Sequence, residues 1–323
     1  PLEKVPVLFY KTINQQQLFR TAQQLQKRFS PLEQAQSRFL LISSSLDITK
    51  ILAEFLQSQP LSELTKAVRN AWFFPLIFEQ NFVFHYQPIF RLKTGRVVAH
   101  ECLVRAHDQQ GNFFGAQQLI DAALETNIIN EFDELIRNIC LQSLSKLNSD
   151  TTFFINIVPN AILNNPIFPE NIATQVEKLG LQPQKIVFEL TEIAKIACSS
   201  QMQQIVSRLR QKGFLIAIDD LCSYTNFESY FLDFCPDIIK IDKQLVRGCS
   251  EHGMKQILLK SILESAHELG CCVVAEGLEK QKDINFCRNI GIDMGQGYGL
   301  GTPQLTLHKS PVDLGIKQLQ VAS

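Results

Sequence analysis

The chain has 323 residues, of which 45% are hydrophobic and 20% are charged. This composition is typical of a folded globular protein and excludes a disordered or fibrous chain. The formal net charge is -1, from 31 basic and 32 acidic residues. Because basic and acidic residues nearly balance, the overall charge gives no reason to expect a DNA or RNA polymer as partner. A small nucleotide needs only a local site.

Two further features concern the cellular compartment. No apolar run reaches the ~18 residues that a membrane-spanning helix needs. The nine cysteines are odd in number and none are paired in a C-x-x-C motif, which favours free buried thiols over disulfides or a zinc site. We therefore expect a cytoplasmic protein, or the cytoplasmic part of a longer one.

The first 75 residues are rich in glutamine and have apolar residues at helical spacing. These residues are Leu18, Ala22, Leu25 and Phe29, followed by Leu32, Ala35, Phe39 and Leu40. Ser30-Pro31-Leu32-Glu33 predicts a helix start, with Ser30 as N-cap and a carboxylate in the first turn. We expect residues 1–75 to form a helical region, either a regulatory region that binds a protein partner or a scaffold.

From residue 76 to about 310, strand and helix patterns alternate. Strands are predicted at 82–86, 97–104, 153–158, 186–190, 215–219, 238–241, 271–275 and near 294, and helices at 116–124, 131–147, 202–212 and 254–269. Eight short strands separated mostly by helices predict an α/β fold of the TIM-type (β/α)8 barrel class. A doubly wound open sheet is disfavoured because no glycine-rich loop follows the first strand. Residues 311–323 are expected to form a tail.

Polar side chains stand at the carboxyl ends of seven consecutive predicted strands. They are Glu101, Asn156, Glu189, the pair Asp219-Asp220, Lys240, Glu276 and Gln296. In a barrel these ends converge on one face, where active sites are built. A single charge at one strand end is commonplace, but seven in succession predict a functional site.

Five carboxylates at one face would repel one another unless cations were bound. Oxygen ligands without cysteine or histidine favour Mg²⁺ or Mn²⁺ over zinc. Adjacent Asp219 and Asp220 could serve two ions, which would activate a water for attack at phosphorus. Lys240 would hold that water and offset the developing negative charge.

The motifs around these residues resemble those of the EAL phosphodiesterase family. Glu101-Cys102-Leu103 resembles the Glu-Ala-Leu signature, with cysteine in place of alanine. The other matching segments, in family order, are Tyr86-Gln87-Pro88-Ile89, Phe154-Ile155-Asn156-Ile157, Phe188-Glu189-Leu190-Thr191-Glu192, Ile218-Asp219-Asp220, Ile239-Lys240-Ile241-Asp242, Ala275-Glu276-Gly277-Leu278-Glu279 and Gln296-Gly297-Tyr298. The resemblance covers roughly residues 78–303.

The resemblance implies a modified barrel whose first strand runs antiparallel, and a reaction that opens cyclic di-GMP to linear pGpG with two Mg²⁺ or Mn²⁺ ions. It implies these roles: Glu101, Asn156, Glu189, Asp219, Asp220 and Glu276 as metal ligands, with Glu101, Glu276 and Lys240 catalytic; Gln87, Leu103, Arg105, Asn156 and Gln296 at the nucleotide; and Glu192, Asp242 and Glu279 as supporting groups. It also implies a homodimer formed through the barrel.

One segment departs from the family pattern. After Asp220 the family has a loop with two glycines, and here the residues are Leu221-Cys222-Ser223-Tyr224-Thr225-Asn226. Glycine permits backbone angles that other residues adopt only at a cost of ~1–2 kcal/mol each. This departure leaves a second hypothesis open, a cyclic di-GMP receptor that binds without useful turnover and signals through the N-terminal helices.

Overall fold

The computed structural model describes residues 15–39, 58–147, 149–163, 165–190, 200–221 and 236–309. The chain divides into two compact units, one made of Pro1–Asn81 with His107–Ile128 and the other of Phe82–Ala106 with Ile129–Ser323. The boundary expected near residue 75 stays a prediction. The helix expected at 116–124 is present, and it belongs to the first unit.

The first unit is mainly helical in its described part. Its elements are α1 (Gln15–Arg28), α2 (Pro31–Gln36), β1 (Arg38–Phe39), β2 (Gln59–Pro60), α4 (Leu61–Arg69), α5 (Phe73–Glu79), β5 (Phe113–Phe114) and α6 (Ala116–Glu125). The predicted start of α2 is confirmed: the Glu33 N–H donates to Ser30 Oγ (3.3 Å), and the Ser30 N–H donates to Glu33 Oε2 (2.8 Å). Each partner therefore satisfies a backbone donor of the other.

The apolar residues at helical spacing do not all lie in a helix, since Phe39 lies in β1; Leu40 falls outside the described residues. Helix α2 ends at Gln36, and β1 pairs antiparallel with β2. The Arg38 side chain donates from Nε to Ser58 Oγ (2.8 Å). The strand pairing and this side-chain bond supply partners that a further helical turn would not, so the periodicity of the apolar residues does not decide the backbone here.

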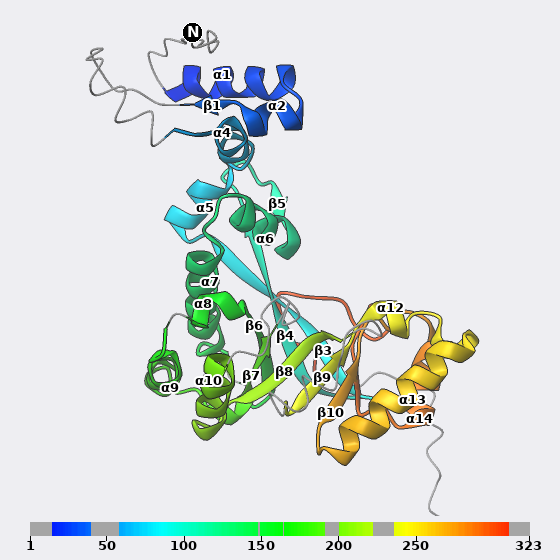
Figure 1. The fold of residues 1–323 in the computed structure, drawn as a ribbon. Coiled ribbons are helices and arrows are strands. Elements are labelled where there is room, and N and C mark those ends of the chain that lie inside the picture. The colour runs from blue at the N-terminus through cyan, green and yellow to red at the C-terminus, as the bar shows by residue number, and fades with distance from the viewer. Residues whose placement is uncertain are drawn as a thin grey trace, which may run out of the picture. The chain divides into compact units, whose positions relative to one another are not determined.

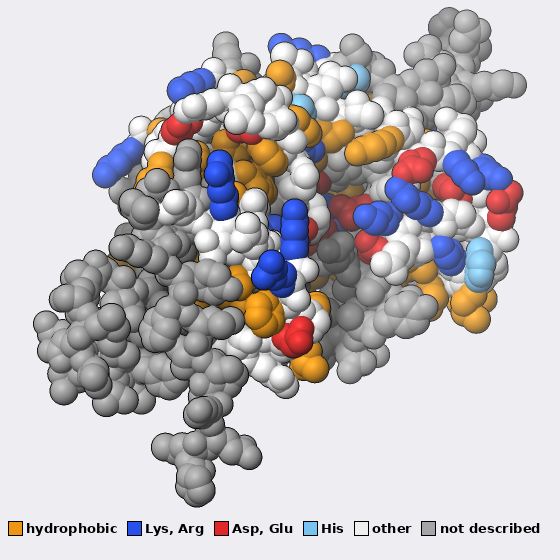
Figure 2. All heavy atoms as spheres, turned by 90° about the horizontal axis from the view of Figure 1, so that it is seen from above, with side chains coloured by type: hydrophobic (Ala, Val, Ile, Leu, Met, Phe, Trp, Pro, Cys, Tyr) orange, Lys and Arg blue, Asp and Glu red, His pale blue; other side chains and the backbone are white. Residues whose placement is uncertain are grey.

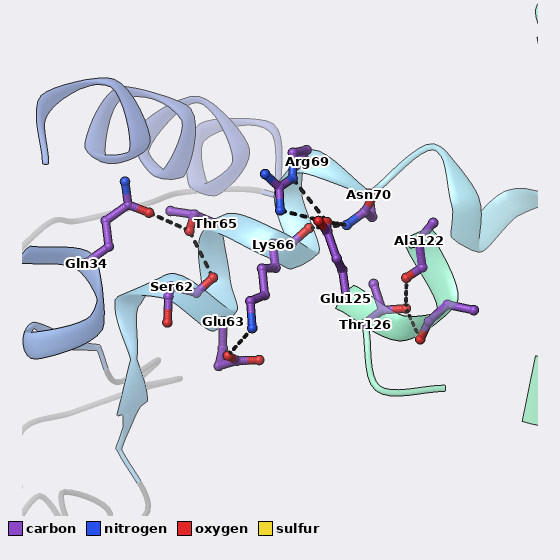
Figure 3. Close-up of polar contacts among 11 residues, drawn as sticks. Gln34, Ser62, Glu63, Thr65, Lys66, Arg69, Asn70, Ala122, Glu125 and Thr126 are labelled. Carbon is purple, nitrogen blue, oxygen red and sulfur yellow. Dashed lines mark hydrogen bonds and ion pairs between the residues drawn. The ribbon is translucent and has the colours of Figure 1, made fainter. Parts of the chain in front are cut away.

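A polar network joins the helices of this unit (Figure 3). Glu125 of α6 accepts hydrogen bonds from Arg69 Nε (3.1 Å) and Asn70 Nδ2 (2.6 Å) at the end of α4. The buried Thr65 hydroxyl donates to Gln34 Oε1 (2.9 Å), which connects α4 to α2. Side chains far apart in the sequence thus hold α2, α4 and α6 together.

The second unit is a closed eight-stranded mixed barrel of the TIM type, as predicted (Figure 1). Its strands are β3 (Phe82–Arg91), β4 (Arg96–His107), β6 (Thr152–Ile157), β7 (Ile186–Leu190), β8 (Leu215–Leu221), β9 (Ile238–Ile241), β10 (Cys272–Ala275) and β11 (Met294–Gly295). From β4 to β11 neighbours run parallel. Strand β3 closes the barrel antiparallel to both β4 and β11.

Helices connect most of these strands. They are α7 (Ile129–Leu144), α8 (Pro159–Leu163), α9 (Phe168–Lys178), α10 (Ser200–Gln211), α12 (Lys243–Val246), α13 (Gly253–Glu268) and α14 (Gln281–Ile290), with short 3-10 turns at Pro183–Lys185 and Cys249–Glu251. Figure 1 shows α7 to α10, drawn in green, along one side of the sheet, and α13 and α14, in yellow to orange, along another. Helices α7, α9, α10 and α13 each bury several apolar side chains, as expected of amphipathic helices that pack on a core.

The interior of the barrel is filled by one apolar layer. It consists of Ile89, Ala99, Phe154, Val187, Ala217, Ile238 and Val274, one from each of seven strands, with Leu215 and Met294 against it. Phe154 is 1% exposed and is the largest of the seven side chains. The layer is a packed floor, and side chains two residues further along the parallel strands lie directly above it because a strand has a side-chain period of two.

A C-terminal segment lies across the outer face of β3 and β4. Gln304 forms an antiparallel bridge to Tyr86, with N–H to O distances of 2.7 and 3.2 Å. The His308 N–H donates to Nε2 of His100, which is 2% exposed. Burial lowers the pKa of His100 to about 4, so the imidazole is neutral and can act as this acceptor.

The structure bears on two expectations from the sequence, those about membrane-spanning helices and about free thiols. None of the helices there is long and apolar enough to cross a membrane. Six cysteines are described as free thiols, five of them buried, and only Cys272 is exposed. The prediction of free thiols is confirmed for these six.

Replacing Phe154 by alanine should lower the free energy of unfolding by about 3–5 kcal/mol, because a cavity would remain in the apolar floor. The measurement is urea denaturation followed by circular dichroism. Ile257→Ala on the outer face of α13, 63% exposed, is the control and should change stability by less than about 0.5 kcal/mol. A loss of under about 1 kcal/mol for Phe154→Ala would contradict the packed floor.

The contribution of His100 to stability should fall as the pH drops from about 6.5 to 4. An unfolded chain protonates His100 near pH 6.5, whereas the folded chain does so only near pH 4. Between these values the unfolded state binds more protons, which destabilises the folded state by at most about 3 kcal/mol. Thermal unfolding of wild type and His100→Gln across this range measures the effect. An identical pH dependence in both proteins would show that His100 is not its source.

Candidate functional site

A polar layer lies on top of the apolar floor. Its members are Gln87, Glu101, Asn156, Glu189, Asp219, Lys240, Glu276 and Gln296. Seven of them come two residues after a residue of the floor or one packed against it, as Glu189 follows Val187, and Gln87 precedes Ile89 by two on the antiparallel strand. Glu276 and Gln296 stand one residue past the ends of β10 and β11. All eight strands thus contribute one polar residue to the same level of the barrel.

Lys240 lies among four carboxylates. Its Nζ is 2.7 Å from Glu189 Oε1, 2.7 Å from Glu276 Oε1, 3.2 Å from Asp219 Oδ1 and 3.5 Å from Glu101 Oε2. The lysine side chain is 1% exposed and that of Glu189 is 0% exposed. Carboxylates from four different strands therefore share one buried ammonium, and the five groups carry a formal charge of -3.

Burial and charge shift the pKa values of this cluster. Burial raises the pKa of Glu189 well above its usual range and that of Glu276 to about 8, although Lys240 counteracts both shifts. Burial by itself would lower the pKa of Lys240, but the four carboxylates hold it well above its usual range. The lysine therefore stays charged, and the carboxylates need more positive charge than it provides.

Two amides hold Glu101 from either side. Gln296 Nε2 donates to Glu101 Oε2 (2.6 Å), and Asn156 Nδ2 lies 3.4 Å from Glu101 Oε1. The first bond is short and buried, whereas the second is at the limit of a hydrogen bond. Gln296 thereby fixes the carboxylate of the signature strand β4.

The donor set fits hard divalent cations. Glu189 Oε2 is buried and accepts no hydrogen bond from the described residues, which is costly for a carboxylate unless a cation is near. Four carboxylates and an amide oxygen are the ligand types that Mg²⁺ and Mn²⁺ prefer. Within the described part of the chain, no three acidic, histidine or cysteine side chains are grouped as a metal site as they stand. Nζ of Lys240 lies between the carboxylates instead.

Three of the five residues predicted at the nucleotide, Gln87, Leu103 and Arg105, lie on the β3–β4 hairpin. Gln87 Nε2 donates to the Gly301 carbonyl (3.3 Å), and Arg105 Nη1 donates to the Val104 carbonyl (2.8 Å). Arg105 is half-buried, and this burial lowers its pKa. Leu103 faces His85 in the hairpin register. Gln87 belongs to the polar layer, and Leu103 and Arg105 follow Glu101 by two and four residues on the same strand.

Two of the three predicted supporting groups are described, and each anchors a loop beside the cluster. Asp242 Oδ1 accepts from the Gln244 N–H (2.7 Å) and caps α12, directly after β9. Glu279 forms an ion pair with Arg247 in the segment that follows Glu276. The position between Glu276 and Leu278 requires glycine. The φ of Gly277 is +64°, and a Cβ there would lie 2.4 Å from Lys243 Cβ.

Other predictions fall outside what the structure describes. These are Glu192, the side chain of Asp220, and the altered loop from Cys222 onward. Sequence reasoning overlooked a buried ion pair of Asp133 and Arg137 in α7. The signal was available, because two opposite charges four residues apart share a helix face with buried Phe132, Cys140 and Leu144.

On the face drawn in Figure 2, acidic and basic side chains of the described residues are interspersed. This pattern agrees with the even balance of charges in the sequence. The acidic cluster around Lys240 is a local feature of the barrel interior.

Comparisons with known proteins agree with this architecture. Among solved structures, the chain is similar to BlrP1 of Klebsiella pneumoniae in a manganese and cyclic di-GMP complex, with a TM-score of 0.62, 26% identity, and coverage of 70% of this chain and 56% of that one. The EAL domain of FimX from Xanthomonas citri in complex with cyclic di-GMP matches with a TM-score of 0.68 at 16% identity, over 77% of this chain and 99% of that one. The latter likeness shows the fold alone.

Curated sequences include two relatives with named activity. Cyclic di-GMP phosphodiesterase PdeB of Shewanella oneidensis is 31% identical over 230 residues, which are 70% of this chain and 27% of that protein. Probable cyclic di-GMP phosphodiesterase PdeB of Escherichia coli is 29% identical over 216 residues, 66% of this chain and 41% of that protein. The chain thus spans less than half the length of these relatives. The model of the EAL domain matches residues 66–303, and the chain belongs to the EAL domain family.

Proposed function

We propose that the chain is a metal-dependent phosphodiesterase that hydrolyses cyclic di-GMP to linear pGpG. The observation that carries this proposal is the cluster of four carboxylates around Lys240 at the level above the barrel floor. The named activities of the relatives from Shewanella oneidensis and Escherichia coli point to the same substrate.

The charge of the cluster argues for catalysis over simple binding. With a formal charge of -3 on the five described groups, the site repels a cyclic dinucleotide that carries two phosphodiester charges. A site that only bound this anion would be better served by basic residues. An acidic cluster becomes useful when divalent cations are bound there, because two such ions bring a charge of +4 and offset the negative charge of the carboxylates.

Glu101, Asn156, Glu189, Asp219, Asp220 and Glu276 would hold two Mg²⁺ or Mn²⁺ ions. When bound, the ions would supply Lewis acidity at phosphorus and make a neighbouring water more acidic. Lys240 would then orient that water and offset negative charge as it develops. Gln296 would keep Glu101 in place, and Gln87, Leu103 and Arg105 would hold the nucleotide, with the forked guanidinium on a phosphate.

A second candidate is a cyclic di-GMP receptor without useful turnover. It is supported by the residues from Leu221 to Asn226, which lack the two glycines of the family loop. Such a receptor would bind the dinucleotide through the same barrel and signal through residues 1–75. A homodimer through the barrel, a protein partner for residues 1–75 and a cytoplasmic location also stay proposals.

The purified chain should convert cyclic di-GMP to pGpG with Mg²⁺ or Mn²⁺, and a chelator should abolish the reaction. Glu101→Gln removes the charge of one proposed ligand and should lower the rate at least about 100-fold. Glu251→Gln, in a surface ion pair with Lys282, is the matched control and should stay within about twofold of wild type. Chromatography of the products measures the rate of pGpG formation by wild type, Glu101→Gln and Glu251→Gln.

Saturable binding without any product would refute the enzyme and establish the receptor. Neither binding nor turnover would refute both candidates. Product formed equally by Glu101→Gln would place the chemistry elsewhere in the chain.

Replacing Lys240 by methionine should lower the stability of the metal-free chain by about 3–5 kcal/mol, because four neighbouring carboxylates would lose their only described cation. Mn²⁺ should then raise the melting temperature more in this variant than in wild type, since the ion no longer competes with the ammonium. Thermal unfolding with a chelator and with Mn²⁺ measures both effects.

Lys282→Met is the control, because it removes an exposed lysine that pairs with Glu251 and should change stability by less than about 1 kcal/mol. Equal stabilisation of wild type and Lys240→Met by Mn²⁺ would argue against competition between the lysine and the metal.

A further inference from the structure

A buried ion pair lies in α7, one of the helices outside the barrel. Asp133 and Arg137 are 8% and 5% exposed, and Arg137 Nη1 donates to Asp133 Oδ2 one helical turn away. The guanidinium carbon of Arg137 lies 4.8 Å from the ring centre of Phe168 in α9. The pair is thus enclosed between two helices that cover the barrel.

The second carboxylate oxygen of Asp133 has a different partner. Oδ1 accepts from the backbone N–H of Val158 (2.9 Å). Val158 directly follows β6, and its own carbonyl accepts from the Ala161 N–H (2.9 Å) as α8 begins. Asp133 therefore fixes the junction at which strand β6 turns into helix α8.

This junction lies two residues beyond Asn156. Among the described residues, the one hydrogen bond made by the Asn156 side chain is weak, since Nδ2 is 3.4 Å from Glu101 Oε1. The direction of the Asn156 amide is therefore set mainly by the backbone of β6 and by what holds its end. Asp133 holds that end from outside the barrel.

Stability alone does not account for the pair. Burial raises the pKa of Asp133, although Arg137 and the Val158 N–H oppose the shift. A carboxylate with a raised pKa is held in its charged form at a cost to folding at neutral pH. Apolar side chains of similar shape often replace a buried ion pair with no loss of stability, so the value of this pair lies in the geometry it imposes.

We propose that Asp133 is a positioning residue, which through its hydrogen bond to the Val158 N–H holds Asn156 in the direction required of a metal ligand. The proposal rests on the metal site of the proposed function. Groups that orient metal ligands change metal affinity by about 10- to 100-fold when removed. Arg137 acts through Asp133, because it fixes the carboxylate and balances its charge.

The chain offers a matched control at the opposite end of the barrel. Asp237 Oδ2 accepts from the Ile216 N–H (2.9 Å), and Arg210 Nη2 donates to Asp237 Oδ1 (2.9 Å). This carboxylate also links a strand backbone to an arginine, but it does so where β8 and β9 begin. Removing the Asp237 carboxylate should therefore lower stability and leave the polar layer unchanged.

The experiment is calorimetric titration of Mn²⁺ into wild type, Asp133→Ala, Asp133→Asn and Asp237→Ala, below the melting temperature of each. Asp133→Ala should weaken Mn²⁺ binding by about tenfold or more. Asp133→Asn keeps an oxygen that can accept from the Val158 N–H and should stay within about threefold of wild type. Asp237→Ala should bind Mn²⁺ as wild type does.

If Asp133→Ala does not fold, the double variant Asp133→Leu with Arg137→Met takes its place, because it removes the acceptor without leaving an unpaired buried charge. Unchanged Mn²⁺ affinity in whichever of the two folds would overturn the positioning role. Equal weakening by Asp237→Ala, or by Asp133→Asn, would overturn it too. Absence of Mn²⁺ binding by wild type would instead refute the metal site of the proposed function, and the inference with it.

Discussion

The site depends on the two-residue period of the barrel strands. Because alternate side chains point inward, a residue in the apolar floor places the residue two positions further along directly above it. Phe154 below Asn156 and Val187 below Glu189 are examples. The floor closes the barrel beneath the polar layer, so the polar groups are desolvated from below and bind ligands only from above.

Desolvation makes the charges of the polar layer interdependent. Lys240 is surrounded by carboxylates from β4, β7, β8 and β10, and each of these strands must be in register for the ammonium to be shared. In a buried site such a lysine cannot be removed without leaving unpaired charge. The same excess of negative charge that makes the metal-free cluster dependent on Lys240 makes it a good host for divalent cations.

The loops and helices beyond the strands determine how firmly this layer is held. Gln296 reaches Glu101 from β11, Asp242 caps α12 beside Lys240, and the Gly277 segment packs against Lys243. The ion pair of Asp133 and Arg137 performs a similar task from outside the barrel. These contacts restrict the side chains and backbone segments that form the polar layer or lie next to it.

The sequence by itself determined the eight strands, the antiparallel first strand through its family resemblance, and the polar residue at each strand end, because strand periodicity and strand termini are local patterns. It also located the start of α2 at Ser30, where a few neighbouring residues suffice. Only the tertiary structure decided that Lys240 lies among four carboxylates, that Gln296 holds Glu101, and that Asp133 reaches Val158, because these pairs join distant segments of the chain. For the same reason the apolar spacing misled at Phe39, where pairing of β1 with β2, some 20 residues apart, overrode a local helical pattern.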